Sequence, residues 1–285
     1  MGFFRSSPRP PCRSHVPQLV SKRLILLRKN TPMARRLFPI LMNLEPRVRR
    51  LRRKDGEARF LAGRNTRLYE LGRVIRIALE FIRGFRALHF VGPCVTLFGS
   101  ARINASHPWC EQSREMGKKL SEMGFTVVTG GGPGIMQAAN QGAFEAGGTS
   151  IGCNIILPHE QRSNPYLDKV VTFYYFFVRK VMLVKYSYAF VIFPGGFGTL
   201  DEMMEAITLI QTGKLYDFPV ILIGKSYWKG LIDWLKESPL KYGTIAADDL
   251  NLLHLTDDLD EAAAIIRNLA GDIGLKLTPP PPRSK

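Results

Sequence analysis

The sequence predicts an α/β protein with a doubly wound, mostly parallel sheet that carries helices on both faces. From residue 94 onward, short apolar runs alternate with longer segments of helical periodicity. Near-continuous apolar runs are typical of parallel strands buried on both faces. Two of these runs end in glycine-rich turns, TGGGPG at 129–134 and PGGFG at 194–198. A chain of 285 residues is long enough to bury such a core.

The individual elements follow from their local patterns. Residues 66–89 carry apolar side chains at three- and four-residue spacing with arginines between them, which predicts an amphipathic helix packed on the main domain. Strands are predicted at 94–101, 125–132, 150–155, 170–176, 189–196, 218–224 and 250–257. Helices are predicted at 109–123, 134–147, 178–187, 199–213, 227–237 and 258–270. Ligands of such sheets bind at the carboxyl ends of the strands, where both glycine turns fall.

The charge distribution divides the chain. Residues 1–90 contain 22 Lys and Arg against five Asp and Glu, whereas residues 91–285 contain 18 against 19. We expect a basic arm (1–55), a helical segment packed on the core (56–92), the α/β core domain (93–272) and a proline-rich tail (273–285). The arm is interpreted as disordered and solvated, or as an organelle-targeting segment, or as a contact for nucleic acid or an anionic membrane. Translation from Met33 or Met42 is a further alternative.

Composition disfavours several classes of protein. The four cysteines are far apart and form no CxxC pair or Cys/His cluster, which argues against a metal site or a disulfide framework and favours a reducing, cytoplasmic location. No apolar run approaches the roughly 20 residues that cross a bilayer, so no membrane partner is expected. A nucleic-acid-binding fold would spread its cations over the folded domain, whereas the net positive charge of this chain belongs to its N-terminal third.

The first glycine turn, Thr129–Met136, differs from the dinucleotide-binding fingerprint GxGxxG. Pro133 occupies a spacer position, and no acid follows about 20 residues later to bind a ribose hydroxyl, so a dinucleotide cofactor is disfavoured. Either the turn needs glycine for backbone reasons, or Gly131, Gly132 and Gly134 bind an anion.

The second turn, FPGGFGTLDE at 193–202, has no lysine after its glycines. Magnesium-dependent hydrolysis of a nucleoside triphosphate is therefore disfavoured, whereas backbone amides at such a turn suit a ligand with one phosphate. Thr199-x-x-Glu202 matches a capping box, so Glu202 is either the partner of an N-cap Thr199 or a catalytic carboxylate. Glu205, one helical turn later, is a second carboxylate of the site or a solvated residue.

A cationic pair, Arg179–Lys180, begins an otherwise apolar helix. Solvation of a polar helix face explains such a pair poorly. A guanidinium beside a phosphate site is chemically reasonable, and a surface salt bridge is the alternative.

PGGFGTLDE (194–202), preceded in the chain by TGGGPGIM (129–136) and YFFVRK (175–180), resembles the LOG (Lonely Guy) family of cytokinin riboside 5′-monophosphate phosphoribohydrolases. The likeness covers roughly residues 80–270 and is greatest to the longer bacterial branch, often labelled lysine decarboxylase-like. It implies a Rossmann-like nucleotide-binding domain that hydrolyses the N-glycosidic bond of an adenosine-type 5′-monophosphate. It also implies that the enzyme needs no cofactor and forms a homodimer or a larger homo-oligomer.

The resemblance and the residue patterns together define a candidate site. Its catalytic residues are Glu202 and Arg179, where a carboxylate can stabilise oxocarbenium-like charge on the ribose and activate water. Its predicted substrate-binding residues are Lys180, Gly131, Gly132, Gly134, Gly195, Gly196, Gly198, Thr199 and Thr208, with Glu205, Gly99 and Ser100 as further candidates. The alternative is a non-catalytic nucleotide or molybdenum-cofactor carrier of the same fold; the Arg179/Glu202 pair favours the enzyme.

Overall fold

The computed structural model describes residues 56–157 and 163–281, which fall into two compact units, 1–64 and 65–285. In the first unit the described part holds the short helix α3 (Gly56–Leu61). The predictions for the arm, 1–55, and for the last four residues lie outside the described residues. The rest of the fold belongs to the second unit.

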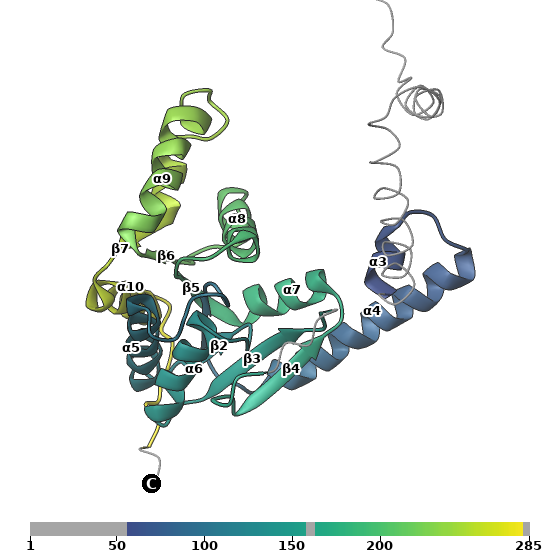
Figure 1. The fold of residues 1–285 in the computed structure, drawn as a ribbon, viewed down its shortest axis with the longest axis horizontal. Coiled ribbons are helices and arrows are strands. Elements are labelled where there is room, and N and C mark those ends of the chain that lie inside the picture. The colour runs from purple at the N-terminus through teal and green to yellow at the C-terminus, as the bar shows by residue number, and fades with distance from the viewer. Residues whose placement is uncertain (1–55, 158–162, 282–285) are drawn as a thin grey trace, which may run out of the picture. The chain divides into compact units, whose positions relative to one another are not determined.

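The second unit is built on one seven-stranded sheet in which every strand pair is parallel, and this confirms the doubly wound prediction (Figure 1). The strand order is β4-β3-β2-β1-β5-β6-β7. The strands are β1 (Cys94–Phe98), β2 (Thr126–Thr129), β3 (Ser150–Ile155), β4 (Lys169–Phe173), β5 (Ser187–Ile192), β6 (Val220–Ile223) and β7 (Leu253–Thr256). Because the strand order reverses between β1 and β5, a ligand crevice is expected outside their carboxyl ends.

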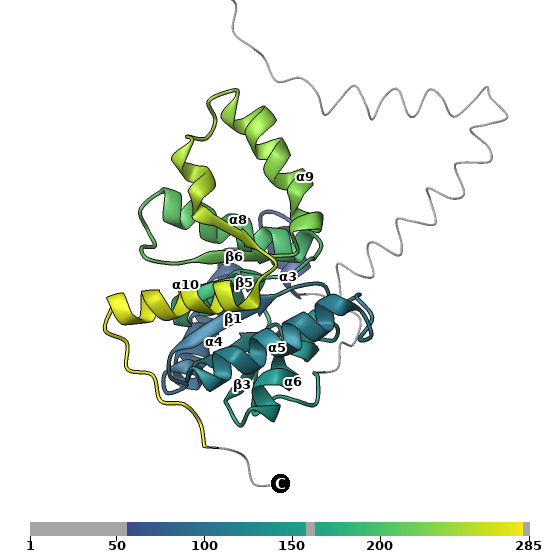
Figure 2. The same cartoon turned by 90° about the vertical axis from the view of Figure 1, so that its left-hand side faces the viewer.

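Helices cover both faces of the sheet. On one face lie α5 (Pro108–Glu122), α6 (Ile135–Glu145) and α10 (Leu259–Asp272), whose apolar side chains form a core cluster with β1, β2, β5 and β6 (Figure 2). The helices α7 (Phe176–Tyr186) and α8 (Phe197–Gln211) contribute no residue to that cluster and contact β3, β4 and β6. Next, α9 (Lys225–Leu235) continues into a π-helical turn, Lys236–Leu240, and a 3₁₀ turn, Asp248–Leu252, precedes β7.

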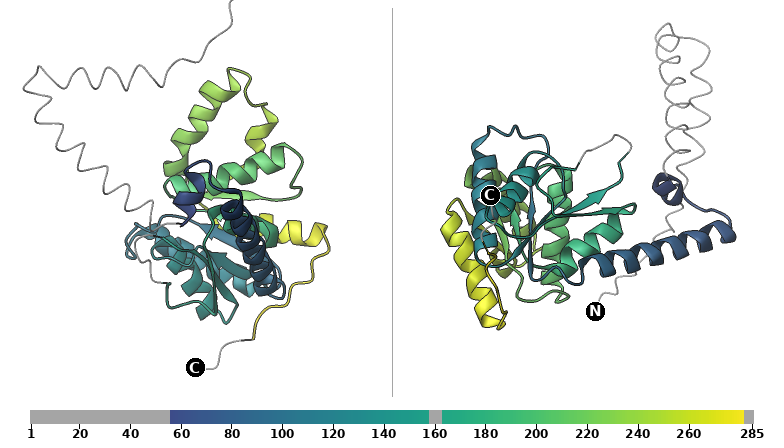
Figure 3. Two further views of the ribbon diagram at one scale, coloured as in Figure 1. Left: turned by 90° about the vertical axis from the view of Figure 1, so that its right-hand side faces the viewer. Right: turned by 90° about the horizontal axis from the view of Figure 1, so that it is seen from below.

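The predicted N-terminal amphipathic helix is α4 (Arg67–Leu88), which contacts α7 and β4 (Figure 3). Its buried residues are Arg73, Gly84 and Leu88; the Arg73 guanidinium donates to the Tyr175 hydroxyl at 3.0 Å. The apolar stripe of the sequence pattern faces solvent instead, at Leu68, Leu71, Val74, Ile75, Leu79, Ile82 and Phe85. The pattern predicted the helix but not the face by which it packs. Among the described residues, no helix combines the length and hydropathy that a membrane span requires.

Candidate active site

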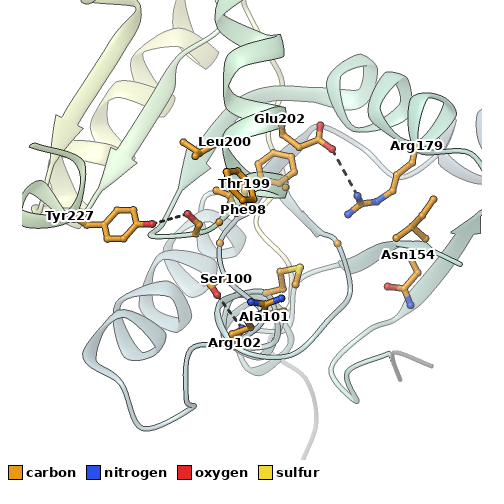
Figure 4. A pocket seen from close by; sticks show the side chains of 18 residues that line it. Phe98, Ser100, Ala101, Arg102, Asn154, Arg179, Thr199, Leu200, Glu202 and Tyr227 are labelled. Carbon is orange, nitrogen blue, oxygen red and sulfur yellow. Dashed lines mark hydrogen bonds and ion pairs between the residues drawn. The ribbon is translucent and has the colours of Figure 1, made fainter. Parts of the chain in front are cut away.

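Three segments meet at the carboxyl ends of β1 and β5. The N–H of Ser100, in the loop after β1, donates to the Pro194 carbonyl at 3.0 Å, in the turn after β5. The Ser100 carbonyl accepts from the N–H of Ile135 at 3.2 Å, at the start of α6. Between them lies a cavity of about 680 Å³, a size that suits a nucleotide-sized ligand (Figure 4). It is lined by residues 98–102, residues 195–200 and side chains that include Met136, Asn154, Arg179, Glu202 and Tyr227.

The N-terminus of α8 opens into this cavity. The helix begins at Phe197 with Gly196 as its N-cap, and no side chain caps it. Within the described part of the chain, the N–H groups of Gly196, Phe197 and Gly198 have no hydrogen-bond acceptor. A Cβ added at Gly196 or Gly198 would meet no atom within 4 Å, because both face open space. Free amides at the positive end of a 15-residue helix suit an anionic group.

Gly195 has a different role from its neighbours. A Cβ at this position would lie 2.1 Å from the Thr199 hydroxyl, so the turn requires glycine for close approach. The Gly195 carbonyl accepts a hydrogen bond from the Tyr227 hydroxyl at 2.8 Å, which ties the turn to α9. Gly195 therefore shapes the turn that presents the free amides.

The capping-box interpretation of Glu202 is wrong. Because α8 begins two residues earlier than predicted, Thr199 is the third residue of the helix and is not its N-cap. Glu202 lies in the next turn with only 3% of its surface exposed, and its Oε2 atom has no hydrogen-bond partner among the described residues. Burial raises the pKa of the Glu202 carboxyl from 4.5 to about 7, although the charges of Arg179 and Lys180 oppose the shift.

Arg179 is the cation that faces Glu202. Its Nη1 atom lies 3.8 Å from Glu202 Oε1 (Figure 4). Its Nε donates to the Cys153 carbonyl at 2.7 Å. A Cβ on Gly130 would come within 2.6 Å of Arg179 Nη2, so glycine at this position makes room for the guanidinium. The structure thus brings the two predicted catalytic residues together on one wall of the cavity.

Lys180 does not line the cavity. Its Nζ atom lies 3.0 Å from Asp201 Oδ1 and 2.7 Å from Glu205 Oε2. Both carboxylates belong to α8, Asp201 directly before Glu202 and Glu205 one helical turn after it. The predicted second carboxylate, Glu205, is thus held by a lysine from the neighbouring helix. Thr208 is exposed and donates to the Met204 carbonyl, also away from the cavity lining.

The first glycine turn is held by a buried polar network. Thr129 Oγ1 accepts from the Gly131 N–H and donates to Asn140 Oδ1, while Asn164 Nδ2 donates to the Gly132 carbonyl. Neither Gly131 nor Gly132 lines the main cavity. Gly134 does not line it either, and a Cβ there would lie 2.5 Å from the Ser100 carbonyl. These contacts support the backbone interpretation of that turn. Its preceding residue, Gly130, does line the cavity, as do Gly99 and Ser100.

The lining side chains that were not among the sequence candidates include Arg102, Met136, Asn154 and Tyr227. Asn154 lies near the end of β3, and Arg102 lies in the loop after β1. Because ligands bind at the carboxyl ends of parallel strands, this position could have marked both residues as candidates. Tyr227 belongs to α9, and no pattern in the sequence marked it as a candidate site residue. In the described ranges, no group of three or more His, Cys, Asp or Glu side chains is arranged to hold a metal ion.

Comparison with known proteins gives related sequences and folds. Residues 136–266 match the family model described as possible lysine decarboxylase. A cytokinin riboside 5′-monophosphate phosphoribohydrolase from Arabidopsis thaliana is 31% identical over 149 residues, which cover 51% of this chain and 68% of that protein. The enzyme of the same name from Mycobacterium marinum is 29% identical over 160 residues, covering 55% and 85%. A molybdenum-cofactor carrier protein from Chlamydomonas superposes with a TM-score of 0.47 at 24% identity, covering 63% of this chain and 98% of that one.

Proposed function

The chain belongs to the LOG family of cytokinin riboside 5′-monophosphate phosphoribohydrolases, and from this premise we propose that it hydrolyses a nucleoside 5′-monophosphate to the free base and ribose 5-phosphate. One observation carries the proposal. The uncapped N-terminus of α8 and the buried, partly unpartnered Glu202 carboxyl face a single cavity. The helix N-terminus suits a phosphate that is bound but not transferred. The Glu202 carboxyl suits a reaction at the ribose.

The 5′-phosphate binds at the free amides of Gly196, Phe197 and Gly198. Binding of this remote group anchors the nucleotide with its glycosidic bond near the catalytic residues. Thr199, buried beside these amides, and the exposed ring of Phe197 complete the edge of the site.

The reaction breaks the bond between the anomeric carbon and the base nitrogen, with the electron pair leaving on the base. A water molecule adds to the anomeric carbon, Glu202 accepts its proton, and the departing base takes up a proton. A carboxyl whose pKa is about 7 is suited to accept a proton near neutral pH. The ionised carboxylate also stabilises the positive charge that develops on the ribose. Arg179, beside Glu202, orients the ribose hydroxyls or assists the departing base.

Lys180 acts through the neighbouring carboxylates. By pairing with Asp201 and Glu205 it neutralises two negative charges that would otherwise raise the pKa of Glu202 further. This role differs from the predicted direct contact with substrate. The positions of Gly131, Gly132, Gly134 and Thr208 outside the cavity lining give no support to a substrate-binding role for them.

We also propose that the protein is a homodimer or a larger homo-oligomer. The exposed apolar stripe on α4 supports this, since six of its side chains are more than half exposed, from Ile82 at 52% to Leu68 at 83%. Light scattering after size exclusion tests it, and the double variant Leu71→Glu/Ile75→Glu should reduce the particle mass. A wild-type monomer would contradict the proposal. The predicted cytoplasmic location stays a prediction.

The direct test of function incubates the full chain with AMP and with N6-isopentenyl-AMP and measures free base and ribose 5-phosphate. Glu202→Gln should lower kcat by roughly 100-fold or more while the fold is retained. Glu122→Gln, an exposed carboxyl on α5, is the matched control and should leave turnover unchanged. Tight nucleotide binding without release of base from any nucleoside monophosphate would favour the carrier alternative instead.

A further inference from the structure

Arg102 lies in the cavity but has no role in the reaction described above. It belongs to the loop that follows β1 and lines the same cavity as Arg179 and Glu202 (Figure 4). Its backbone N–H donates to the Ser100 hydroxyl at 3.1 Å. Ser100 in turn is tied to Pro194 and to Ile135 by the hydrogen bonds described above. The backbone that carries Arg102 is therefore fixed between the glycine turn before α8 and the start of α6.

The other cations near the site are already engaged. Arg179 donates to the Cys153 carbonyl and faces Glu202, while Lys180 pairs with two carboxylates outside the cavity lining. Across the described part of the chain, the Arg102 guanidinium has no hydrogen-bond or ion-pair partner, and the residue is exposed. Arg102 is thus the cavity cation that is free to bind a ligand.

The α8 N-terminus supplies less positive charge than the phosphate group of a nucleotide would need for neutralisation. A nucleotide 5′-phosphate carries a charge of about −1.5 to −2 at neutral pH. The N-terminus of a helix supplies about half a positive charge, and the glycine turn contains no lysine. A guanidinium matches phosphate oxygens with two parallel hydrogen bonds, which supplies both charge and geometry.

We propose that Arg102 binds the 5′-phosphate together with the α8 N-terminus and makes the site selective for nucleoside monophosphates over nucleosides. The inference rests on the proposed function for the identity of the phosphorylated ligand. Arg102 is a substrate-binding residue in this proposal, so its loss weakens nucleotide binding and leaves the chemistry at Glu202 in place. Because Arg102 is exposed, its contribution to affinity decreases as salt concentration rises.

The test compares the wild type with Arg102→Ala, Arg102→Lys and the control Arg267→Ala, an exposed arginine on α10. Affinities for AMP and for adenosine are measured by calorimetry in the Glu202→Gln background, where turnover cannot interfere. Arg102→Ala should weaken AMP binding roughly 10- to 100-fold, as expected for loss of hydrogen bonds to a charged group, and should leave adenosine binding unchanged. Arg102→Lys should recover part of the loss, and Arg267→Ala should change neither affinity.

Steady-state kinetics separate the two proposals. With active enzyme, Arg102→Ala should raise KM for AMP and change kcat little, and ribose 5-phosphate should inhibit the variant more weakly by a similar factor. Equal loss of AMP and adenosine affinity, or no loss of either, would overturn the role of Arg102 while leaving the hydrolase proposal intact. Binding that depends on Arg102 in a protein that never releases base would refute the hydrolase and retain the phosphate contact. A wild type that binds no AMP would overturn both.

Discussion

Replacing Glu202 by Gln should make the protein more stable above neutral pH while it lowers kcat by roughly 100-fold or more. The carboxyl has a pKa of about 7 in the folded protein against an ordinary value of 4.5, because burial disfavours its charged form. Between these two pH values the unfolded chain has lost a proton that the folded chain retains. Since the folded state binds more protons, stability falls as pH rises through this window. Gln is a close neutral analogue of the protonated side chain and does not undergo this loss.

The magnitude follows from the two pKa values. A difference of 2.5 units corresponds to about 3 kcal/mol of lost stability once pH is well above 7. At pH 5 only about 0.8 kcal/mol of that loss is present, because this pH lies just above the ordinary pKa of 4.5 that the side chain has in the unfolded chain. The stability advantage of Glu202→Gln over the wild type should therefore grow by about 2.5 kcal/mol between pH 5 and pH 8.

Urea denaturation followed by circular dichroism at several pH values measures this difference directly. The groups that titrate in both proteins cancel when the variant is compared with the wild type. Glu122→Gln removes an exposed carboxyl and should show a difference that does not depend on pH. A variant that is less stable than the wild type at pH 8, as expected if Glu202 capped a helix, would refute the reasoning. A difference that stays constant from pH 5 to 8 would refute it equally.

Four further predictions concern the cavity and the elements around it. The kcat of the wild type with AMP should rise with pH through an apparent pKa near 7 as Glu202 ionises; a kcat that is flat from pH 5.5 to 8.5 would contradict this assignment. Gly198→Ala places a methyl group in the open space at the α8 N-terminus, so it should raise KM for AMP about tenfold with an unchanged Tm, and an unchanged KM would contradict the phosphate site. Gly195→Ala, whose Cβ would contact Thr199, should instead lower Tm by several degrees. Asn140→Ala leaves the Thr129 hydroxyl without its acceptor and should lower the free energy of unfolding by about 1–3 kcal/mol in urea denaturation, with kcat unchanged; a loss below about 0.5 kcal/mol would contradict the buried network.

The sheet could be predicted because its signals are local: apolar runs, helical periodicity and glycine turns occur within single segments. The start of α8 could not be placed in the same way. Thr199 and Glu202 fit a capping box, but the Leu200 N–H donates to the Gly196 carbonyl, so the helix begins earlier. The sequence pattern of α4 predicted an amphipathic helix but did not indicate which of its faces packs on α7. Likewise, the role of Asn140 depends on partners in β2 and β3, which sequence spacing does not reveal.

The burial of Glu202 separates an enzyme from a carrier more clearly than the phosphate site does. Both classes need an anion site, and the free amides at the start of α8 serve either. A carrier gains nothing from a carboxyl that is 3% exposed with one oxygen unpartnered, because such burial lowers stability above neutral pH by about 3 kcal/mol. A hydrolase gains a group that accepts a proton near pH 7 and faces the ribose of a bound nucleotide. A measured loss of stability at Glu202 above neutral pH would therefore support chemistry at the anomeric carbon, and the stabilisation expected for Glu202→Gln is the measurement that tests it.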